Sequence, residues 1–559
     1  MGSTPVSPSP ESKGRFSRLA DDPMLEDYSL RYAPSTFRRW SEYTCATAAL
    51  GGIAYLADFA IGASIALSFG FTNAITAILL AAVVIFLTSF PIAYYSAKYS
   101  IDMDLLTRGA GFGYFGSTLT SLIYASFTFI FFALEGSIMA QAFDRGLGIP
   151  LWLGYLITSL MVLPLVVFGM TLISKLQVWT QPIWLFLMFA PFVAILIDDP
   201  GSYSAFTGFE GASKTSGFEY LQLGAGAGIA LSLIAQIGEQ VDYLRFMPAK
   251  TEANSRRWWT AVIAAGPGWV VLGALKQMGG AFLAFFVIKS VGTAGAGEPI
   301  EQFIGGFDVF LPGWLIVGLA VFFVVLSQVK INVTNAYSGS LSWSNFFSRV
   351  LHWHPGRVVW VFFNVGIALV LMEANLFSFL NDVLAFYSNV AIAWIGAVVA
   401  DLVINKPLLN VSPSYIEFKR AHLYPINPVG FGSMVVASTL SILAYFNAFG
   451  DTLDAYSPFV ALAFAMVLSP IIAVATKGKY YIARQPSIGP GDLAAGETSE
   501  TVKCVVCSEA FEVPDMAHCP FHTGAICSLC CTLDKSCHDM CKRPAQGSEP
   551  DPEGSVAHA

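Results

Sequence analysis

Long apolar stretches without a single charged residue run through most of this sequence, among them residues 73–94, 151–169 and 310–328. Each stretch is close to the ~20 residues that a helix needs to cross a ~30 Å hydrocarbon core. Because that core holds no water to bond free backbone groups, such stretches must be helical. Charged residues make up only 12% of the chain, about half of the quarter that is typical of soluble proteins. The sequence therefore predicts an all-α polytopic membrane protein embedded in a lipid bilayer.

Twelve spans are predicted within residues 41–480, which form one transmembrane domain behind a polar amino-terminal segment, residues 1–40. Only Glu373, Ala374 and Asn375 separate the ninth span from the tenth. The predicted spans are 44–68, 73–97, 114–142, 150–170, 177–197, 219–240, 258–289, 308–335, 357–373, 376–404, 429–449 and 456–475.

The basic residues of the connections give this map an orientation, because Lys and Arg accumulate on the cytoplasmic side of a membrane. The connections assigned to the outside carry only Arg145, Lys214 and Lys289. An even number of spans then places both termini in the cytoplasm, in a chain of the inner or plasma membrane. The connections assigned to the cytoplasmic side carry Lys98, Arg108, Lys175, Arg245, Lys250, Arg256, Arg257, Arg349, Arg357, Lys406, Lys419 and Arg420.

Two spans combine helix-weakening glycines with polar residues. The first contains Gly51, Gly52 and Asp58, and the sixth contains the alternating glycines of residues 224–228. Glycine-interrupted spans at corresponding positions of two halves indicate an inverted-repeat transporter with its site at the breaks. The alternative interpretation is close packing of small residues between helices.

Ionisable residues deep in apolar spans cost several kcal/mol and normally face a cavity or one another. Asp58, Glu135 and Lys330 lie deepest, so we expect functional roles for them; the alternative is a structural ion pair that holds helices together. The full set of candidates is Asp58, Glu135, Glu239, Lys276, Lys330, Glu373 and Asp382.

The eighth span has a polar face whose amides and hydroxyls offer the donors and acceptors that a heterocyclic base needs. Four phenylalanines of the third span precede Glu135, where planar rings can stack on phenyl groups. The polar face comprises Ser327, Gln328, Lys330, Asn332, Thr334, Asn335, Ser338 and Ser340, and the phenylalanines are Phe127, Phe129, Phe131 and Phe132.

Three segments resemble the purine–cytosine permease family, the first nucleobase:cation symporter family. Residues 96–113 resemble its loop after the second helix, with Lys98, Asp102, Arg108 and Gly111-Phe112-Gly113. Residues 242–246 resemble its element after the sixth helix, and residues 332–345 resemble its eighth-helix region. The resemblance covers roughly residues 35–480.

That resemblance implies a LeuT-like fold of five plus five helices in an inverted repeat, with two extra helices. It also implies a substrate site near the midplane, among helices one, three, six, eight and ten. Carried over by position, the substrate-binding residues are Asp58, Phe131, Glu135, Gly226, Gln236, Asn332, Thr334 and Asn335.

The same resemblance bears on the coupling ion. Members that use sodium place small hydroxyl residues just before the position of Asn332, where this chain has Lys330 and Ile331. We therefore predict that the ammonium of Lys330 replaces sodium, and that Lys330 and Asp58 together permit coupling to protons or simple facilitated diffusion.

After a polar linker, residues 481–502, comes a Cys/His-rich module, residues 503–543, and then a tail predicted to be disordered, residues 544–559. Eight of the nine cysteines lie in the module. In a reducing cytosol such clusters bind metal rather than form disulfides. Four ligand pairs predict two structural zinc ions: Cys504 with Cys507, Cys519 with His522, Cys527 with Cys530, and Cys537 with Cys541.

These observations predict a permease for a nucleobase, a hydantoin or a related nitrogen heterocycle. The alternative is a transporter-derived sensor that signals through the zinc module, which could also dock a cytoplasmic protein partner. No Walker motif is present, which argues against ATP-driven pumping. No nucleophile–base set indicates an enzyme, and the module has too few basic residues for nucleic acid.

Overall fold

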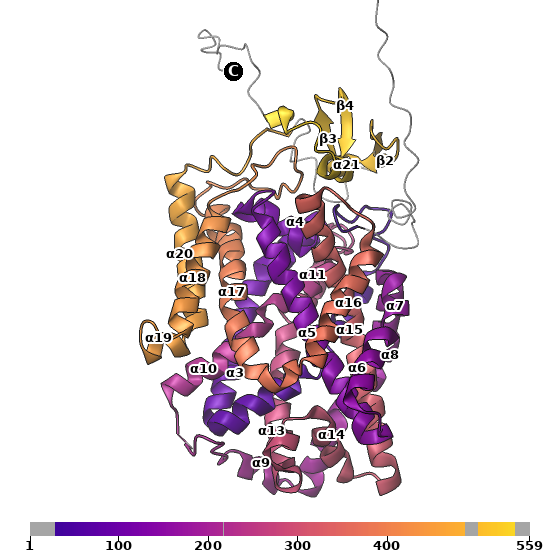
Figure 1. Ribbon diagram of the computed structural model, residues 1–559, viewed down its shortest axis with the longest axis vertical. Helices are drawn as coiled ribbons and strands as arrows, with labels where there is room; N and C mark the ends of the chain where they lie inside the picture. The colour runs from indigo at the N-terminus through magenta and orange to yellow at the C-terminus, as the bar shows by residue number, and fades with distance from the viewer. Residues whose placement is uncertain (1–27, 216, 487–500, 543–559) are drawn as a thin grey trace, which may run out of the picture.

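The computed structural model describes residues 28–215, 217–486 and 501–542 (Figure 1). Most of the predicted linker, the tail that was predicted to be disordered and the first 27 residues therefore lie outside the described residues. Within the described part the chain forms a bundle of long helices, and a small module of short strands lies on one end of the bundle (Figure 1).

The first five predicted spans are all helical. They correspond to α2 (Glu42–Gly52) with the start of α3 (Ala57–Tyr99), the remainder of α3, α5 (Ser117–Leu147), α6 (Leu151–Met161) with α7 (Leu163–Val167), and α8 (Met170–Asp198).

The next five spans repeat this pattern, again beginning with a broken helix. They are α10 (Tyr220–Ala230) with the 3₁₀ turn η3 (Leu231–Gln236) and α11 (Ile237–Leu244), α12 (Ser255–Ala265) with α13 (Trp269–Ala296), α15 (Gly313–Leu351), α16 (Arg357–Glu373), and α17 (Leu380–Ala400). The two extra helices are α18 (Gly430–Tyr445) and α20 (Ser457–Ala475). The predicted five-plus-five architecture with two further helices is confirmed.

Eight helical stretches of the described chain are long and apolar enough to cross a bilayer, and two shorter apolar helices accompany them. This number is below twelve partly because α3, with 43 residues, contains two spans. The chain bends between them at Gly70, whose φ of 74° suits glycine. A Cβ at Gly70 would lie 2.7 Å from the carbonyl oxygen of Phe209, so no other residue fits there.

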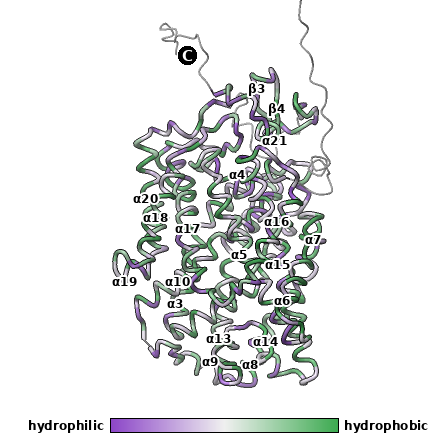
Figure 2. Tube along the Cα trace, viewed as in Figure 1, coloured by the Kyte–Doolittle hydropathy of each residue, from purple (hydrophilic) through white to green (hydrophobic). Residues whose placement is uncertain are grey.

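The outside of the bundle is apolar. Trp179 is 81% exposed, Phe186 70% and Leu87 65%. Figure 2 shows hydrophobic colour along the long helices. The polar residues of the spans are buried instead, which is the arrangement that a lipid solvent demands.

The Cys/His-rich module contains two antiparallel hairpins and one short helix. Strand β1 (Thr501–Lys503) pairs with β2 (Ala510–Glu512), β3 (Met516–Cys519) pairs with β4 (Gly524–Cys527), and α21 (Ser528–Leu533) follows. We call the end of the bundle that the module contacts the module face. It is formed by residues 28–41, 352–356, 406–428 and 476–486. The opposite end carries α9 (Gly201–Phe206), α14 (Pro299–Asp308) and α19 (Asp451–Ala455) (Figure 1).

Candidate functional site

The first span is unwound over Ile53–Leu56, between α2 and α3. In lipid the freed backbone groups need partners from neighbouring helices. Gln328 of α15 accepts the N–H of Leu56 at 3.2 Å, and the carboxylate of Glu135 on α5 accepts the N–H of Ala57 at 3.2 Å. Gln328 Nε2 also donates to Glu135 Oε2 at 2.5 Å. The predicted break is therefore present, and Glu135 accepts a hydrogen bond from Ala57, the first helical residue after it.

The carbonyl groups of the same break surround the ammonium of Lys276, from α13. Nζ of Lys276 lies 2.6 Å from the oxygen of Ile53 and 2.8 Å from that of Tyr55. It also lies 2.8 Å from Oδ2 of Asp58, while Gln277 donates to Oδ1 of Asp58 at 2.9 Å. The face of the Tyr55 ring covers the ammonium, with its centroid 3.7 Å away. Lys276 and Asp58 are at most 1% exposed, so this is a fully desolvated ion pair.

The sixth span is broken in the corresponding place, at η3. Gln236 ends this turn, and its Nε2 donates to Oε2 of Glu239 at 2.8 Å. Glu239 is completely buried at the start of α11. Glu239, one of the ionisable candidates, therefore lies inside the bundle and not at the surface of its inner end. Gly226, on α10, packs against α3, where an added Cβ would meet Ala77 and Ile65 at about 3 Å.

The polar face of α15 points into the bundle. Asn332 donates to the carbonyl of Phe132 on α5 at 3.3 Å, and Asn335 donates to Asn332 at 3.1 Å. The hydroxyl of Thr334 lies 2.8 Å from that of Tyr243, on α11. Phe131 is buried on α5 with its ring centroid 4.5 Å from that of Phe127.

The ammonium of Lys330 does not lie beside Asp58, where the predicted coupling role would place it, but against α8. Its ammonium donates to the carbonyl of Gln177, the hydroxyl of Thr180 and the side chain of Gln181, at 2.9–3.0 Å. These residues belong to α8, and the partner of Asp58 is Lys276. The coupling roles of Lys330 and Asp58 remain predictions, but the two side chains have different partners.

Sequence reasoning did not include Lys276, Gln277, Gln328, Gln177 or Tyr243 among the substrate-binding residues, although Lys276 is one of its ionisable candidates and Gln328 lies on its polar face of the eighth span. A usable signal existed for the first two, because Lys276-Gln277 is an adjacent polar pair in the middle of an otherwise apolar span. Gln177 and Tyr243 carried no such signal, since both lie near predicted span ends. Their importance follows only from the packing, in which Gln177 donates to the carbonyl of Lys330 at 2.6 Å.

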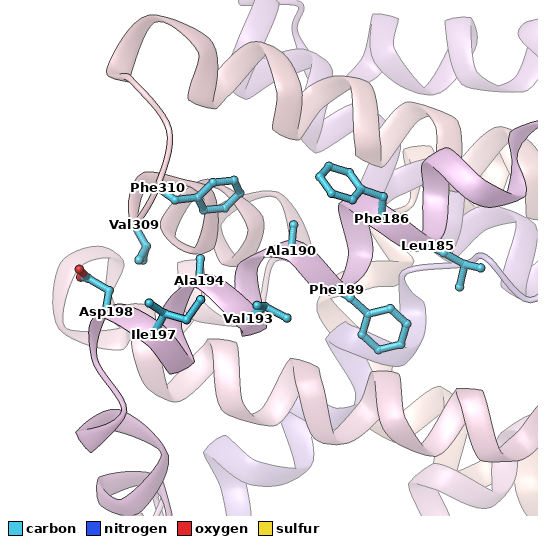
Figure 3. A pocket seen from close by; sticks show the side chains of 10 residues that line it. All are labelled: Leu185, Phe186, Phe189, Ala190, Val193, Ala194, Ile197, Asp198, Val309 and Phe310. Atoms are coloured by element: carbon cyan, nitrogen blue, oxygen red, sulfur yellow. The ribbon is translucent and has the colours of Figure 1, made fainter.

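Two surface hollows accompany this buried cluster. A cleft of about 500 Å³ opens between α10, α17 and α20, on the end opposite the module, and Asp382, Asp451 and Asp454 line it. A groove of about 690 Å³ runs along α8 and is lined by phenylalanines, including Phe186 and Phe310 (Figure 3). The groove faces the lipid and is apolar, so it is not part of the polar site.

The module brings four of the predicted metal ligands together. The sulfur atoms of Cys504, Cys507, Cys527 and Cys530 all lie within 4.8 Å of one another. Sulfurs around a tetrahedral zinc ion, each at ~2.3 Å, are separated by roughly 3.8 Å, so this cluster fits a metal ion. Hydrogen bonds from Cys527 and Cys530 hold the pKa of the Cys507 thiol well below its usual value, which favours the thiolate that binds metal.

The other predicted ligands form a looser group. Cys519, Cys537 and Cys541 line a small cavity beside the membrane domain, together with Cys531. His522 lies with Nε2 2.6 Å from Oδ2 of Asp534.

No family model and no curated protein matches the sequence. Solved structures match it across most of its length. Mhp1, described as a nucleobase-cation-symport-1 family transporter and solved in a closed conformation with bromovinylhydantoin bound, has a TM-score of 0.59 at 17% identity, over 82% of this chain and 99% of its own. Mhp1 in an inward-facing conformation has a TM-score of 0.57 at 18% identity, over 82% and 98% of the two chains.

A sialic acid symporter described as Na⁺-coupled, in a substrate-bound outward-open state, has a TM-score of 0.54 at 14% identity. It covers 80% of this chain and 94% of its own. At these identities the likeness shows a shared fold. The chain thus has the LeuT-like fold that the resemblance of its sequence implied.

Proposed function

We propose that this protein is a secondary active transporter that moves a nucleobase, a hydantoin or a related nitrogen heterocycle by alternating access, without sodium. Two broken spans converge on a buried polar cluster, which is the arrangement of inverted-repeat carriers. Amide and carboxyl groups of this cluster, from Glu135, Gln236, Asn332 and Asn335, offer the donors and acceptors that such a ring requires. Its aromatic neighbour is Phe131.

The observation that carries the sodium independence is the position of Lys276. A sodium ion bound at the unwound segment would need the oxygen atoms of that segment as ligands. The ammonium of Lys276 already takes three of them, from Ile53, Tyr55 and Asp58, at 2.6–2.8 Å. The positive charge of a lysine is attached to the protein, so at this position the ammonium takes the place of a sodium ion from solution. Lys276 thereby takes the part that the sequence suggested for Lys330, and Asp58 remains the acid partner for any coupled proton.

Purified protein in proteoliposomes tests this proposal. Uptake of radiolabelled uracil, cytosine, adenine and hydantoin is measured with sodium, potassium or choline as the external cation, each at two pH gradients. We expect uptake of at least one compound at equal rates in all three cations. Strict dependence on sodium contradicts the coupling proposal, and no uptake or binding of any compound contradicts the proposed substrate class.

The orientation and the metal belong to the same proposal. The protein lies in the inner or plasma membrane with both termini in the cytoplasm. The distribution of basic residues among the connections supports this orientation. The module holds about two zinc ions, the first at the four clustered cysteines.

A second function, a membrane sensor that signals through the module, is favoured by the direct contacts between the module and the membrane domain, such as Arg420 with Asp534. Deleting residues 485–559 separates the two functions. A carrier retains uptake after the deletion. A sensor retains ligand binding but loses the signal that a cytoplasmic protein partner would receive from the module.

A further inference from the structure

The two groups of cysteines in the module differ in their surroundings. The cluster of Cys504, Cys507, Cys527 and Cys530 is compact and belongs to the module alone. The second group surrounds a cavity of about 10 Å³ that Ala421 of the membrane domain helps to close. This is roughly the space of one water molecule, which also suits one metal ion. Four cysteine residues line this cavity, spaced more widely than the first cluster, whose sulfur atoms all lie within 4.8 Å of one another: Cys519, Cys531, Cys537 and Cys541.

The walls of this cavity also form the interface with the membrane domain. Arg420 donates to the carbonyl of Cys531 at 2.9 Å and to that of Asp534 at 2.6 Å, and its Nε lies 3.1 Å from Asp539. The thiol of Cys541 approaches the carbonyl of Ala421 at 3.9 Å. The segment that supplies Cys531, Cys537 and Cys541 is therefore the one that contacts residues 420–421.

Further contacts join the module to other parts of the module face. Glu512 accepts hydrogen bonds from the hydroxyls of Tyr32 and Ser35 and from the N–H of Ser35, the last at 2.8 Å. His352, just after α15, lies 3.3 Å from the carbonyl of Thr532. The module thus bonds both to the segment that leads into α2 and to the end of α15.

We propose that a second metal ion with the thiol preference of zinc binds between Cys519, Cys531, Cys537 and Cys541, and that its binding docks the module onto the module face. Four thiolates around one small cavity are the donor set of a structural zinc site. An ion at this position would link Cys519 of β3 to residues 531–541, the segment that carries the contacts to residues 420–421. The first site folds the hairpins, whereas the second orders the docking surface.

Docking has a mechanical consequence that rests on the proposed transport function. Any opening of the bundle that separates α2 from α15 at the module face would break these contacts of the module. The docked module ties the residues before α2 to the residue after α15, so it holds this face closed. Occupancy of the second site by metal would then control access from the side on which the module lies.

Elemental analysis and hydrogen exchange of the full-length protein test the proposal without any substrate. We expect about two zinc ions per chain in the wild type and about one in Cys531→Ser and in Cys541→Ser. In both variants amide exchange rises in residues 28–41 and 417–422, while β3 and β4 stay protected. Cys45→Ser, which removes the one cysteine outside the module, is the control and retains two ions.

Two results overturn the proposal. If Cys531→Ser keeps two ions while His522→Ala loses one, the ligand set is wrong. If the second ion is lost and exchange outside the module does not change, metal binding does not control docking.

Arg420→Ala tests docking separately, because it leaves every thiol in place. This variant should keep two ions and show about the same rise in exchange in residues 28–41. Arg39→Ala is the matched control, since Arg39 is exposed and, within the described residues, donates to the nearby carbonyl of Thr36 alone. Unchanged exchange in Arg420→Ala overturns the docking role. A failure of the transport assay leaves these measurements unaffected, so the two proposals fail independently.

Discussion

At the scale of single residues, the buried charges decide what this site can bind. Lys276, Asp58, Glu135 and Glu239 are all withdrawn from water, so each depends on the partner that packing provides. Lys276 and Asp58 neutralise each other, and Glu135 accepts hydrogen bonds from Ala57 and Gln328. Within the described part of the chain, Glu239 accepts a hydrogen bond from Gln236 alone. The cluster thus contains more acids than bases, which suits a solute that presents N–H groups.

Replacing Lys276 by alanine should convert the protein to one that responds to sodium. The variant leaves Asp58 without its partner, a loss that costs about 3–5 kcal/mol in buried pairs. It also frees the oxygens of Ile53, Tyr55 and Asp58 for a cation. We expect a lower melting temperature that sodium chloride raises relative to choline chloride. Lys289→Ala, an exposed lysine of the same helix, should behave like the wild type in both salts. An equal response of Lys276→Ala to both salts would contradict the assigned role of Lys276.

Glu135→Gln should weaken solute binding about tenfold or more, because it removes a charged acceptor worth about 1.5–3 kcal/mol per hydrogen bond. Asn332→Ala should weaken binding similarly. Isothermal titration with a compound identified by the uptake assay measures both effects. Glu373→Gln, at the exposed end of α16, serves as the control. Unchanged affinity in both test variants would place the binding cavity elsewhere.

At the scale of elements, close approach between α3 and α13 positions the ion pair. A Cβ at Gly62 would lie 1.8 Å from the carbonyl oxygen of Gln277, and one at Gly280 would lie 2.1 Å from that of Phe59. The two helices therefore touch backbone to backbone directly after Asp58 on α3 and directly after Lys276 on α13. Side chains larger than glycine at these two positions would force the helices apart.

Gly280→Val should therefore lose folded protein or more than about 3 kcal/mol of stability, since overpacking typically costs ~1–3 kcal/mol and here the backbone itself must move. Gly318→Ala provides the control, because nothing lies within 4 Å of a Cβ there. We expect Gly318→Ala to be neutral or slightly stabilising, as glycine costs about 0.5–1 kcal/mol inside a helix. Thermal unfolding monitored by size-exclusion chromatography distinguishes the two. Equal stability of both variants would contradict the backbone contact.

Glu417, in the connection between α17 and α18, should make the stability of the fold depend on pH in the acid range. Burial raises the pKa of Glu417, but Lys419 and His422 outweigh it and lower that pKa from 4.5 to about 2. Ionised Glu417 therefore stabilises the fold above pH 4.5, by up to about 3 kcal/mol, and this contribution is lost as the pH falls from 4.5 toward 2. Glu417→Gln should be less stable at neutral pH yet lose less stability between pH 5 and pH 3. Parallel acid profiles of the two proteins would contradict this assignment.

The elements themselves were predictable from the sequence, and the pairing within the site was not. Span positions follow from the length of apolar runs, and even the three-residue separation at Glu373 is present, with Asn375 in a left-handed turn. Lys276 and Lys330 look equivalent in sequence, since each interrupts an apolar span. Only the packing of α13 on α3, and of α15 on α8, decides which lysine reaches the unwound segment.

At the scale of the whole molecule, the metal module links chain segments that are far apart in sequence. Arg31 lies with its guanidinium 4.5 Å from the ring of Phe511, and Lys419 donates to the carbonyl of Pro514 at 3.0 Å. Four of the eight module cysteines could be grouped correctly from their spacing as pairs, but spacing alone did not reveal which pairs share an ion. The structure joins the first pair with the third.

Removing metal from the full-length protein should therefore affect more than the module. With a strong chelator we expect loss of the strands β1–β4 and exposure of residues 28–41, while the helical core stays folded. Circular dichroism should show little change in helix content, and limited proteolysis should cut first near residues 28–41 and 501–542. Stoichiometric disulfides and no metal in freshly purified, unreduced protein would contradict the metal assignment.

The lysine that bridges the unwound segment also determines which joints of the molecule can move. Lys276 fastens the break at Ile53 and Tyr55 to α13, and the glycine contacts fasten α13 to α3. The unwound segment is thus held to α13 and cannot act as a flexible hinge. Any swing of this braced half against α5 and α15 must instead rupture the hydrogen bonds of Leu56 and Ala57 to Gln328 and Glu135. The strength of these hydrogen bonds would then determine the rate of each transport cycle, so stronger bonds would slow transport.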